Sequence, residues 1–379
     1  MDKIDELLTR GVENIIPNKD ELEKILRSGK KLNVYFGIDP TATHIHLGHA
    51  VPLRKLQSLV ELGHNVTFLI GDFTALIGDT SDKESERPIL TKEEIEINFQ
   101  TYKAQAQKIL DFSKVTLRHN SKWLDKLTPR DFVGLFQKFS LNDFISRELI
   151  KKRLATAGHI RLDEVVYPLL QGYDSYLMDT DLQIGGTDQT FNMQAGRFLQ
   201  KSLRNKESFV VATGFLTGTD GRKMSKSWDN AIWLDDSPSD IFGKVMSIRD
   251  DLINEYFVLG TNIPLDQIKT DGHPMSLKKE LAWQIVLELH SAKDADKAKG
   301  QFENTFQKGN IDSADAVEVA VGGTIIESLI KSGLASSKSE AKRLLEQKAI
   351  EKDGKILSTD DKIKPGVYKI GKKKFLKIV

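Results

Sequence analysis

The chain has 379 residues, of which 39% are hydrophobic and 29% charged, and its net charge is +1. This length predicts two or three domains. The absence of cysteine excludes disulfides, thiolate metal sites and a thiol nucleophile. No apolar run approaches the ~20 residues that a membrane span needs. The N-terminus has the pattern of an acidic helix start and not of a signal peptide, so a cytoplasmic protein is expected.

Charge is divided unevenly along the chain. Residues 321–379 hold 14 Lys and Arg against seven Asp and Glu, a net charge of +7, which leaves −6 for residues 1–320. A basic end on an acidic body favours a polyanionic partner for the C-terminus. A lysine-rich end that is only solvated fits the same count, so charge alone leaves both interpretations open.

The first strong pattern is a strand, a helix and a second strand in succession. Residues 33–38 have the composition of a buried strand, and an apolar-periodic helix follows as far as Leu62. Gly63 stands where a helix C-cap glycine belongs, and residues 65–70 form the next predicted strand. A βαβ unit of this kind predicts a parallel sheet with a ligand crevice at the carboxyl ends of its strands.

The rest of the chain alternates between helical and strand patterns. Residues 91–165 are expected to be mostly helical, with little strand character, and to form an insertion between two halves of the sheet. Residues 293–320 are polar and weakly periodic, which suits a linker. The remaining predicted strands are 182–186 and 209–213, with short ones near 351–356 and 367–378. The remaining predicted helices are 241–259, 277–290, 325–331 and 338–348.

Two short motifs carry chemistry. His46-Leu47-Gly48-His49 opens the first predicted helix, where free amide groups and partial positive charge favour phosphate. The two imidazoles are suited to donate hydrogen bonds to phosphoryl oxygens, and Gly48 leaves room for a nucleotide. Taken alone, two histidines at this spacing also fit capping or core roles.

The second motif is Lys223-Met224-Ser225-Lys226-Ser227, which follows a glycine-containing loop. Its lysines would reach the β- and γ-phosphates of ATP as flexible point charges. The preceding glycines would let the loop close and open. A solvated surface loop fits the motif alone, but its order after the histidine motif and the βαβ unit favours an ATP site.

These motifs resemble the signature of class I aminoacyl-tRNA synthetases, and the chain is similar over nearly its whole length to bacterial tyrosyl-tRNA synthetases. Further residues that carry the resemblance are 35–41 (Tyr-Phe-Gly-Ile-Asp-Pro-Thr), 77–79 (Ile-Gly-Asp), 167–174 and 183–189 (Gln-Ile-Gly-Gly-Thr-Asp-Gln). Tyr167, Gln171 and Asp174 are spaced by four and three, so a helix would place them on one face.

The resemblance implies a tyrosine pocket made by Tyr35, Asp79, Tyr167, Gln171, Asp174 and Gln189. Tyr35 and Asp174 would hold the phenol hydroxyl of the substrate. Tyr167, Gln171 and Asp79 would surround the α-ammonium group, a cation that needs acceptors. Gln189 and Asp39 would support the pocket or contact the ammonium and carboxylate groups.

The resemblance also implies an ATP site made by Gly37, Asp39, Thr41, His46, Gly48, His49, Gly186, Asp188, Lys223, Ser225 and Lys226. Its catalytic members would be His46, His49, Lys223 and Lys226. Asp188 would bind the ribose. Mg²⁺ would accompany ATP, which is a substrate, and neither a tightly bound cofactor nor a protein metal site is expected. Lys83 and Arg87 would add a phosphate clamp, or they form a surface charge cluster with neighbouring glutamates.

The implied fold is α/β, with a Rossmann-like parallel-sheet catalytic domain over 1–228 that includes the helical insertion. A helical anticodon-proximal domain and linker would span 229–320. Residues 321–379 resemble the S-four RNA-binding domain of a ribosomal protein, a small α+β unit. In it Ser337 or Ser339 would begin a helix that presents Lys338, Lys342 and Arg343 to the RNA backbone.

The implied activity is that of a tyrosine–tRNA ligase. Tyrosine and ATP would give tyrosyl-adenylate and pyrophosphate, and the tyrosyl group would pass to the 3′-terminal adenosine of tRNA(Tyr). A homodimer formed through the helical insertion is expected from the family, with no membrane partner. Two alternatives stay open: a tryptophanyl-tRNA synthetase, and a catalytically inactive RNA-binding protein derived from a synthetase.

Overall fold

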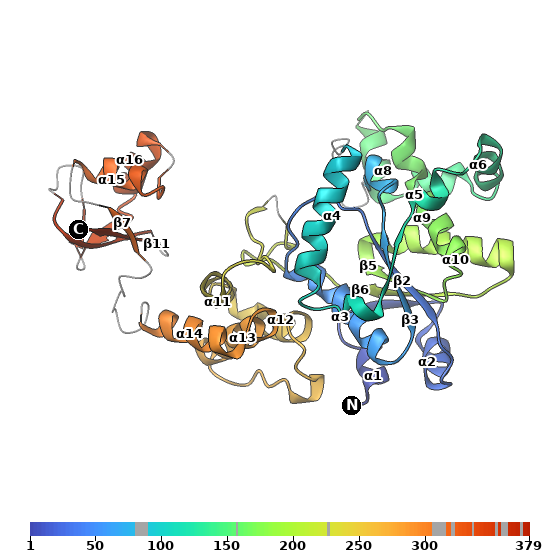
Figure 1. The fold of residues 1–379 in the computed structure, drawn as a ribbon, viewed down its shortest axis with the longest axis horizontal. Coiled ribbons are helices and arrows are strands. Elements are labelled where there is room, and N and C mark those ends of the chain that lie inside the picture. Colours follow the sequence, from blue (N-terminus) through green and yellow to red (C-terminus); the bar gives the residue numbers. More distant parts are fainter. Residues whose placement is uncertain are drawn as a thin grey trace. The chain divides into compact units, whose positions relative to one another are not determined.

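The computed structural model describes residues 1–79, 90–156, 158–225, 228–304, 316–319, 323–335, 337–352, 355–357, 363–371 and 374–379. The chain divides into two compact units, Met1–Asp296 and Lys297–Val379 (Figure 1). Each unit has a sheet of its own. The finer domain boundaries expected from the sequence stay a prediction.

The first unit is built on a six-stranded sheet in the order β1-β6-β5-β2-β3-β4. All neighbouring strands run parallel except β1, which pairs antiparallel with β6. The strands are β1 (Val12–Ile16), β2 (Asn33–Ile38), β3 (Asn65–Ile70), β4 (Thr116–His119), β5 (Leu182–Gly186) and β6 (Phe209–Thr213). The four strands predicted in this region, which are β2, β3, β5 and β6, are confirmed with the expected bounds.

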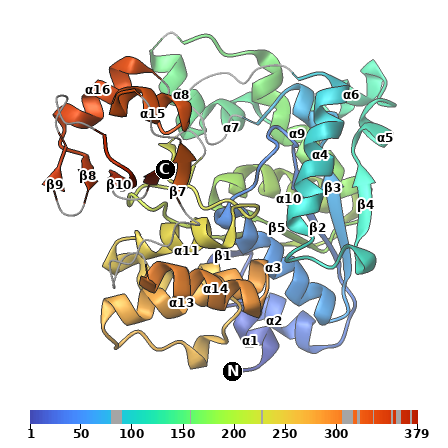
Figure 2. The same cartoon turned by 60° about the vertical axis from the view of Figure 1, so that its left-hand side comes forward.

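Helices cover both faces of this sheet (Figure 2). The helices before the sheet's first parallel strand are α1 (Lys3–Leu7) and α2 (Lys19–Arg27). Those between strands are α3 (Leu47–Glu61), α4 (Lys92–Ala106), α5 (Ser121–Leu124), α6 (Pro129–Phe136), α7 (Leu141–Ile145), α8 (Glu148–Ala155), α9 (Leu162–Leu177) and α10 (Thr190–Arg204). Right-handed crossovers put α3 and α4 on one face and α9 and α10, which pack together, on the other.

The direction of the crossovers reverses between β2 and β5. From β2 the chain winds outward through α3 to β3, and from β5 it winds the opposite way through α10 to β6. Helix α3 ends as predicted, because Gly63 adopts a φ of +84° just beyond the last turn. A reversal of this kind opens a crevice at the carboxyl ends of the two central strands.

The helical insertion is mostly helical, as expected, and contains one short strand whose position was not predicted. β4 lies within it and extends the sheet at its edge, parallel to β3. The strand has only four residues, alternates between exposed and half-buried positions, and includes the charged Arg118, so its local pattern is weak. β1, at the opposite edge, is likewise short and half exposed and was not expected.

Helices after the sheet complete the first unit: α11 (Pro238–Met246), α12 (Ile253–Gly260) and α13 (Pro274–Leu289). Helix α14 (Ala292–Phe302) spans the point where the chain divides, in a stretch expected to be a linker. Residues 305–315 of that stretch lie outside the described part. Among the described residues, no helix combines the length and apolar character needed to cross a bilayer.

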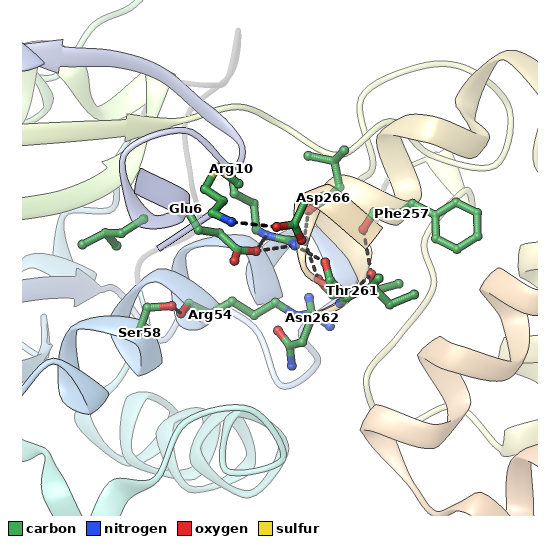
Figure 3. Close-up of polar contacts among 12 residues, drawn as sticks. Glu6, Arg10, Arg54, Ser58, Phe257, Thr261, Asn262 and Asp266 are labelled. Atoms are coloured by element: carbon green, nitrogen blue, oxygen red, sulfur yellow. Dashed lines mark hydrogen bonds and ion pairs between the residues drawn. The ribbon is translucent and has the colours of Figure 1, made fainter. Parts of the chain in front are cut away.

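Two arginines, the buried Arg54 and the half-buried Arg10, tie α12 to the N-terminal part of the unit (Figure 3). Arg54 on α3 and Arg10 after α1 donate hydrogen bonds to backbone carbonyls at the end of α12: Val258, Leu259, Gly260 and Thr261. The last carbonyls of a helix lack intrahelical donors, so guanidinium groups satisfy them here. Arg54 also pairs with Glu288 of α13 at 3.0 Å. Helices α3, α12 and α13 are therefore held together by one side chain.

The second unit has a five-stranded sheet in the order β7-β11-β10-β8-β9. Its strands are β7 (Ala316–Val319), β8 (Ile350–Lys352), β9 (Lys355–Ile356), β10 (Gly366–Ile370) and β11 (Lys374–Ile378), and its helices are α15 (Ile325–Lys331) and α16 (Lys338–Glu346). An apolar core that includes Leu329, Leu345 and Tyr368 joins helices and sheet. Ser337 caps α16, and the predicted α+β character is confirmed.

Candidate active site

The predicted site residues of the first unit gather where strands end. β2 is followed by Asp39, β3 by the loop that leads to Asp79, and β5 by Asp188 and Gln189. The crossover reversal between β2 and β5 brings these three loops to the same edge of the sheet.

Tyr35 and Gln183 belong to a cluster of buried polar side chains. They are register neighbours on β2 and β5, and the hydroxyl of Tyr35 donates a hydrogen bond of 3.2 Å to Oε1 of Gln183. Burial, and then the negative charge of Asp174, raise the pKa of the Tyr35 hydroxyl, while a hydrogen bond with Gln171 opposes the shift. The hydroxyl is therefore protonated and available as a donor.

Asp174 lies on α9 with its carboxylate buried. Nε1 of Trp123 donates to one oxygen at 2.7 Å, and Nδ2 of Asn120 donates to the other at 3.1 Å. The pKa of Asp174 is raised to about 8, chiefly by burial. The two hydrogen bonds lower this pKa, and the negative charge of Asp39 raises it further. The carboxyl group is thus poised between its neutral and ionised forms near neutral pH.

A second group of polar contacts continues from Asp174 toward Asp39. Asn120 also donates to Oγ1 of Thr74 at 3.0 Å, and the Thr74 hydroxyl donates to Oδ1 of Asp39 at 2.7 Å. The other oxygen of Asp39 accepts a hydrogen bond of 2.8 Å from the hydroxyl of Tyr167. A β-carbon at Gly71 would lie 2.1 Å from Oδ1 of Asp39, so glycine is needed there for this carboxylate to fit.

Tyr167 is surrounded by acceptors. Burial, followed by the charges of Asp39 and Asp79, raises the pKa of its hydroxyl well above the usual value. Asp79 in turn accepts a hydrogen bond of 2.6 Å from Nε2 of Gln189. Carboxylates concentrated around one buried hydroxyl make this end of the buried cluster suited to a cation.

The histidine motif begins α3. His46 is the N-cap residue, and its backbone amide donates to Nδ1 of His49 at 3.2 Å. The two rings lie 4.0 Å apart between centroids. Burial, then the positive charges of His49 and Lys223, lower the pKa of His46 to about 2, so its imidazole is neutral. A β-carbon at Gly48 would lie 3.0 Å from the His46 ring, so glycine keeps space for that ring.

The lysine motif reaches the same edge of the sheet. Nζ of Lys223 lies 3.9 Å from Oδ2 of Asp188 and 3.7 Å from the centroid of the Phe215 ring. Its positive charge is one cause of the lowered pKa of His46. Trp233, which follows the lysine motif, forms an antiparallel bridge with His46, and their rings lie 5.8 Å apart between centroids, so the two motifs lie at the same edge of the sheet. A β-carbon at Gly186 would lie 2.5 Å from Asp188, so the glycine leaves that carboxylate room.

The side chain of Asn230 holds the lysine motif together. It accepts a hydrogen bond from the amide of Ser225 at 2.8 Å, and its Nδ2 donates to Oδ1 of Asp220 at 2.7 Å and to the carbonyl of Lys223 at 3.1 Å. Asn230 is buried, and a β-carbon at Gly218 would lie 2.3 Å from it. One asparagine therefore joins the two ends of the loop.

Some of the predicted site residues lie in the second unit, and others fall outside the part of the chain that the structure describes. Lys226, Lys83 and Arg87 fall outside the described residues, so their predicted roles stay predictions. Lys338, Lys342 and Arg343 are exposed on α16 of the second unit. Gly37 lies in β2 and Thr41 lies in the loop that follows this strand, as expected from the sequence. Within the described part no group of three or more His, Asp or Glu could hold a metal ion.

Several polar residues of the site were not assigned from the sequence, among them Thr74, Asn120, Trp123, Gln183 and Asn230. Gln183 could have been found from the sequence, because it is the one polar side chain of a predicted buried strand. A buried polar side chain needs a hydrogen-bond partner. Asn120 and Trp123 follow β4, the strand that was missed, so their position at the sheet edge could not be inferred.

The site can be compared with known proteins at this point. Residues 27–307 match the family described as tRNA synthetases class I (W and Y). The fold and the site thus define a class I aminoacyl-tRNA synthetase, an ATP-using ligase. Tyrosine–tRNA ligase 2 of Vibrio vulnificus is 42% identical over 98% of this chain and 97% of its own length. The tyrosine–tRNA ligase of Thermotoga maritima is 40% identical over 98% and 96%. The chain belongs to the tyrosine–tRNA ligase family.

Solved structures agree on the fold. A tyrosyl-tRNA synthetase of Archaeoglobus fulgidus, complexed with L-tyrosine, has a TM-score of 0.60 and 23% identity, covering 79% of this chain and 100% of that one. A C-terminally truncated mitochondrial tyrosyl-tRNA synthetase of Coccidioides posadasii has a TM-score of 0.65 and 23% identity, covering 79% and 91%. Both share the α/β architecture of the first unit.

Proposed function

We propose that the protein is a tyrosine–tRNA ligase that activates tyrosine with ATP and then transfers the tyrosyl group to the 3′-terminal adenosine of tRNA(Tyr). The observation that carries this proposal is 42% identity over 98% of the chain to a ligase of that name. It favours the tyrosyl enzyme over the tryptophanyl one, and the presence of both phosphate-binding motifs argues against an inactive RNA-binding relative.

The cluster of buried polar side chains around Tyr35, Asp174 and Asp39 is the proposed tyrosine site. The phenol hydroxyl would lie between Tyr35 and Asp174, whose pKa of about 8 lets the carboxyl group accept or donate a hydrogen bond. Phenylalanine would leave these buried groups unpaired, at a cost of about 1–3 kcal/mol for each one. The α-ammonium group would lie near Tyr167, Gln171 and Asp79, where carboxylates concentrate negative charge.

The proposed ATP site lies between the two motifs. A carboxylate oxygen of tyrosine attacks the α-phosphorus and forms the new O–P bond, while the bond from that phosphorus to the bridging oxygen breaks and pyrophosphate leaves. The histidines and Lys223, with Lys226, would stabilise the charge that develops on the phosphates. Mg²⁺ would enter bound to ATP as part of the substrate. Asp188, whose Oδ2 lies 3.9 Å from Nζ of Lys223, would bind the ribose.

The second unit is the proposed tRNA-binding part. Residues 321–379 carry a net charge of +7, and Lys338, Lys342 and Arg343 are all exposed on α16. Salt-dependent contacts with the phosphate backbone suit this surface. A tRNA partner is also the reason to expect the protein in the cytoplasm.

We further propose that two copies of the chain associate through the helical insertion. Large apolar side chains are exposed on α6, α7 and α10: Val133, Phe136, Leu141 and Phe198. The ring of Phe198 on α10 lies 4.9 Å from that of Phe139 in the insertion, so α10 packs against this part of the chain. Exposed apolar groups on such a surface are candidates for a contact with a second copy. Light scattering of Phe136→Glu should report a monomer where the parent reports a dimer, and a monomeric parent would refute the dimer.

The test of the proposed reaction is ATP–pyrophosphate exchange with tyrosine, tryptophan or phenylalanine as the only amino acid. Exchange with tyrosine alone is expected. The control variant is Asn254→Ala, which changes an exposed residue of α12 and should leave exchange intact. Exchange that depends on tryptophan would overturn the proposal, and so would the absence of exchange with all three amino acids.

A further inference from the structure

The segment that leads into the lysine motif is hydrogen-bonded to two consecutive residues of α12, Glu255 and Tyr256. The amide of Thr217 donates to Oε1 of Glu255 at 2.6 Å, and its hydroxyl donates to Oε2 of the same carboxylate at 3.0 Å. The carbonyl of Thr217 accepts a hydrogen bond of 2.7 Å from the hydroxyl of Tyr256, which is fully buried. All three polar groups of Thr217 are therefore bound to one helix.

Thr217 lies directly opposite Lys223. The two residues form an antiparallel bridge, and a tight turn joins them, closed by a 2.6 Å hydrogen bond from the amide of Gly218 to the carbonyl of Arg222. Gly221 adopts a φ of +90° in this turn, a conformation that favours glycine. In so short a hairpin, fixing one strand also fixes the other.

Helix α12 is itself tied to the helix that carries the histidines. Arg54 of α3 donates hydrogen bonds to the carbonyls of Leu259 and Gly260 at the end of α12, and His46 is the N-cap residue of α3. One continuous set of contacts thus runs from the histidine motif along α3, through Arg54 to α12, and through Glu255 to the strand opposite Lys223. The set spans both sides of the proposed phosphate site.

We propose that Glu255 is a positioning residue for the adenylation step, which sets the place of Lys223 relative to His46 by fixing Thr217 on α12. The proposal rests on the proposed function, because Lys223 must contact the phosphates of ATP for its placement to matter. Glu255 binds Thr217 and would act on the phosphates only through Lys223. Its contribution is expected in the rate of the chemical step, since a small misplacement of a phosphate ligand weakens transition-state contacts.

The experiment measures the single-turnover rate constant of tyrosyl-adenylate formation in the full chain at saturating tyrosine and ATP. Glu255→Ala should lower it by about 10- to 100-fold, with the tyrosine dissociation constant unchanged. Glu255→Gln should restore most of the rate, because its carbonyl accepts from the amide and its NH₂ group can donate to the rotatable hydroxyl of Thr217. Asn254→Ala, on the exposed face of α12, is the matched control.

A double-mutant cycle separates this proposal from the proposed function. Glu255→Ala combined with Lys223→Ala should be no slower than Lys223→Ala alone, because Glu255 acts through Lys223. Additive losses, or equal losses in rate and tyrosine binding, would overturn the positioning role. If Lys223→Ala forms adenylate at the parent rate, the assignment of Lys223 in the proposed function fails instead.

Discussion

The indole of Trp123 donates a 2.7 Å hydrogen bond to the carboxylate of Asp174, so a residue after the edge strand β4 orients an acid on α9. Asn120 binds the other oxygen of the same carboxylate at 3.1 Å. Two donors from one turn thus fix the acid that faces Tyr35 in the proposed pocket. The specificity of the pocket depends on this supporting pair as well as on the acid itself.

Replacing Asp174 by Ala should abolish tyrosine activation, because the phenol hydroxyl would lose its partner and Trp123 and Asn120 would be left with unpaired donors. Tyrosine-dependent ATP–pyrophosphate exchange measures the first effect, and filter binding of tRNA measures whether the rest of the protein is intact. Binding of tRNA should stay near the parent value. Equal loss of exchange and tRNA binding would contradict the pocket assignment.

The raised pKa of Asp174 makes stability depend on pH. The folded chain holds the proton up to about pH 8, whereas the unfolded chain releases it near the ordinary aspartate pKa of 3.8. Burial of this group therefore opposes folding more strongly as pH rises from 4 to 8, by about 1.4 kcal/mol per pH unit. Asp174→Asn should become progressively more stable than the parent over this range in urea unfolding. A pH-independent difference would mean that the carboxyl group stays ionised in the folded chain.

His46 should contribute to adenylation as a neutral donor. Its pKa is lowered to about 2 by burial and by the charges of His49 and Lys223, so it does not change protonation between pH 6 and 8. His46→Gln should slow adenylate formation by about 10²-fold, as loss of one transition-state donor does, with the shape of the pH–rate profile preserved. An inflection near pH 6.5 that the variant removes would show instead that His46 titrates in the active protein.

The basic surface of α16 should act on tRNA alone. Substituting Lys338, Lys342 and Arg343 together by Ala should leave ATP–pyrophosphate exchange unchanged and raise the tRNA KM in aminoacylation. Each lost phosphate contact should reduce the slope of log affinity against log salt by about one. Lys19→Ala, an exposed residue of α2, is the control. An unchanged salt slope would assign the tRNA surface to other residues.

Arg54 should be important for stability. Arg54→Met would leave Glu288 and the carbonyls of Leu259 and Gly260 without their buried donor, which predicts a loss of about 3–5 kcal/mol in chemical unfolding. Arg27→Met makes the same chemical change at an exposed ion-pair cluster and should cost no more than about 1 kcal/mol. Similar losses for the two variants would contradict the network.

The sequence by itself determined the central strands, the helix between β2 and β3 and the two phosphate-binding motifs. These features are local: continuous apolar runs mark buried parallel strands, and Gly63 marks the end of α3. The family followed from the same residues, because motifs of particular side chains at fixed spacing can be recognised in the sequence without knowing which residues are in contact. The α+β character of the second unit was likewise local.

Only the tertiary structure decided which polar groups meet. The pairs Tyr35–Gln183, Trp123–Asp174 and Thr217–Glu255 join segments far apart in the chain, so no local pattern predicts them. The edge strands β1 and β4 owe their place to pairing with a neighbour, because their own residues are few and half exposed. The pKa values of His46 and Asp174 depend on burial and on distant charges, which exist only once the sheet and its helices have packed.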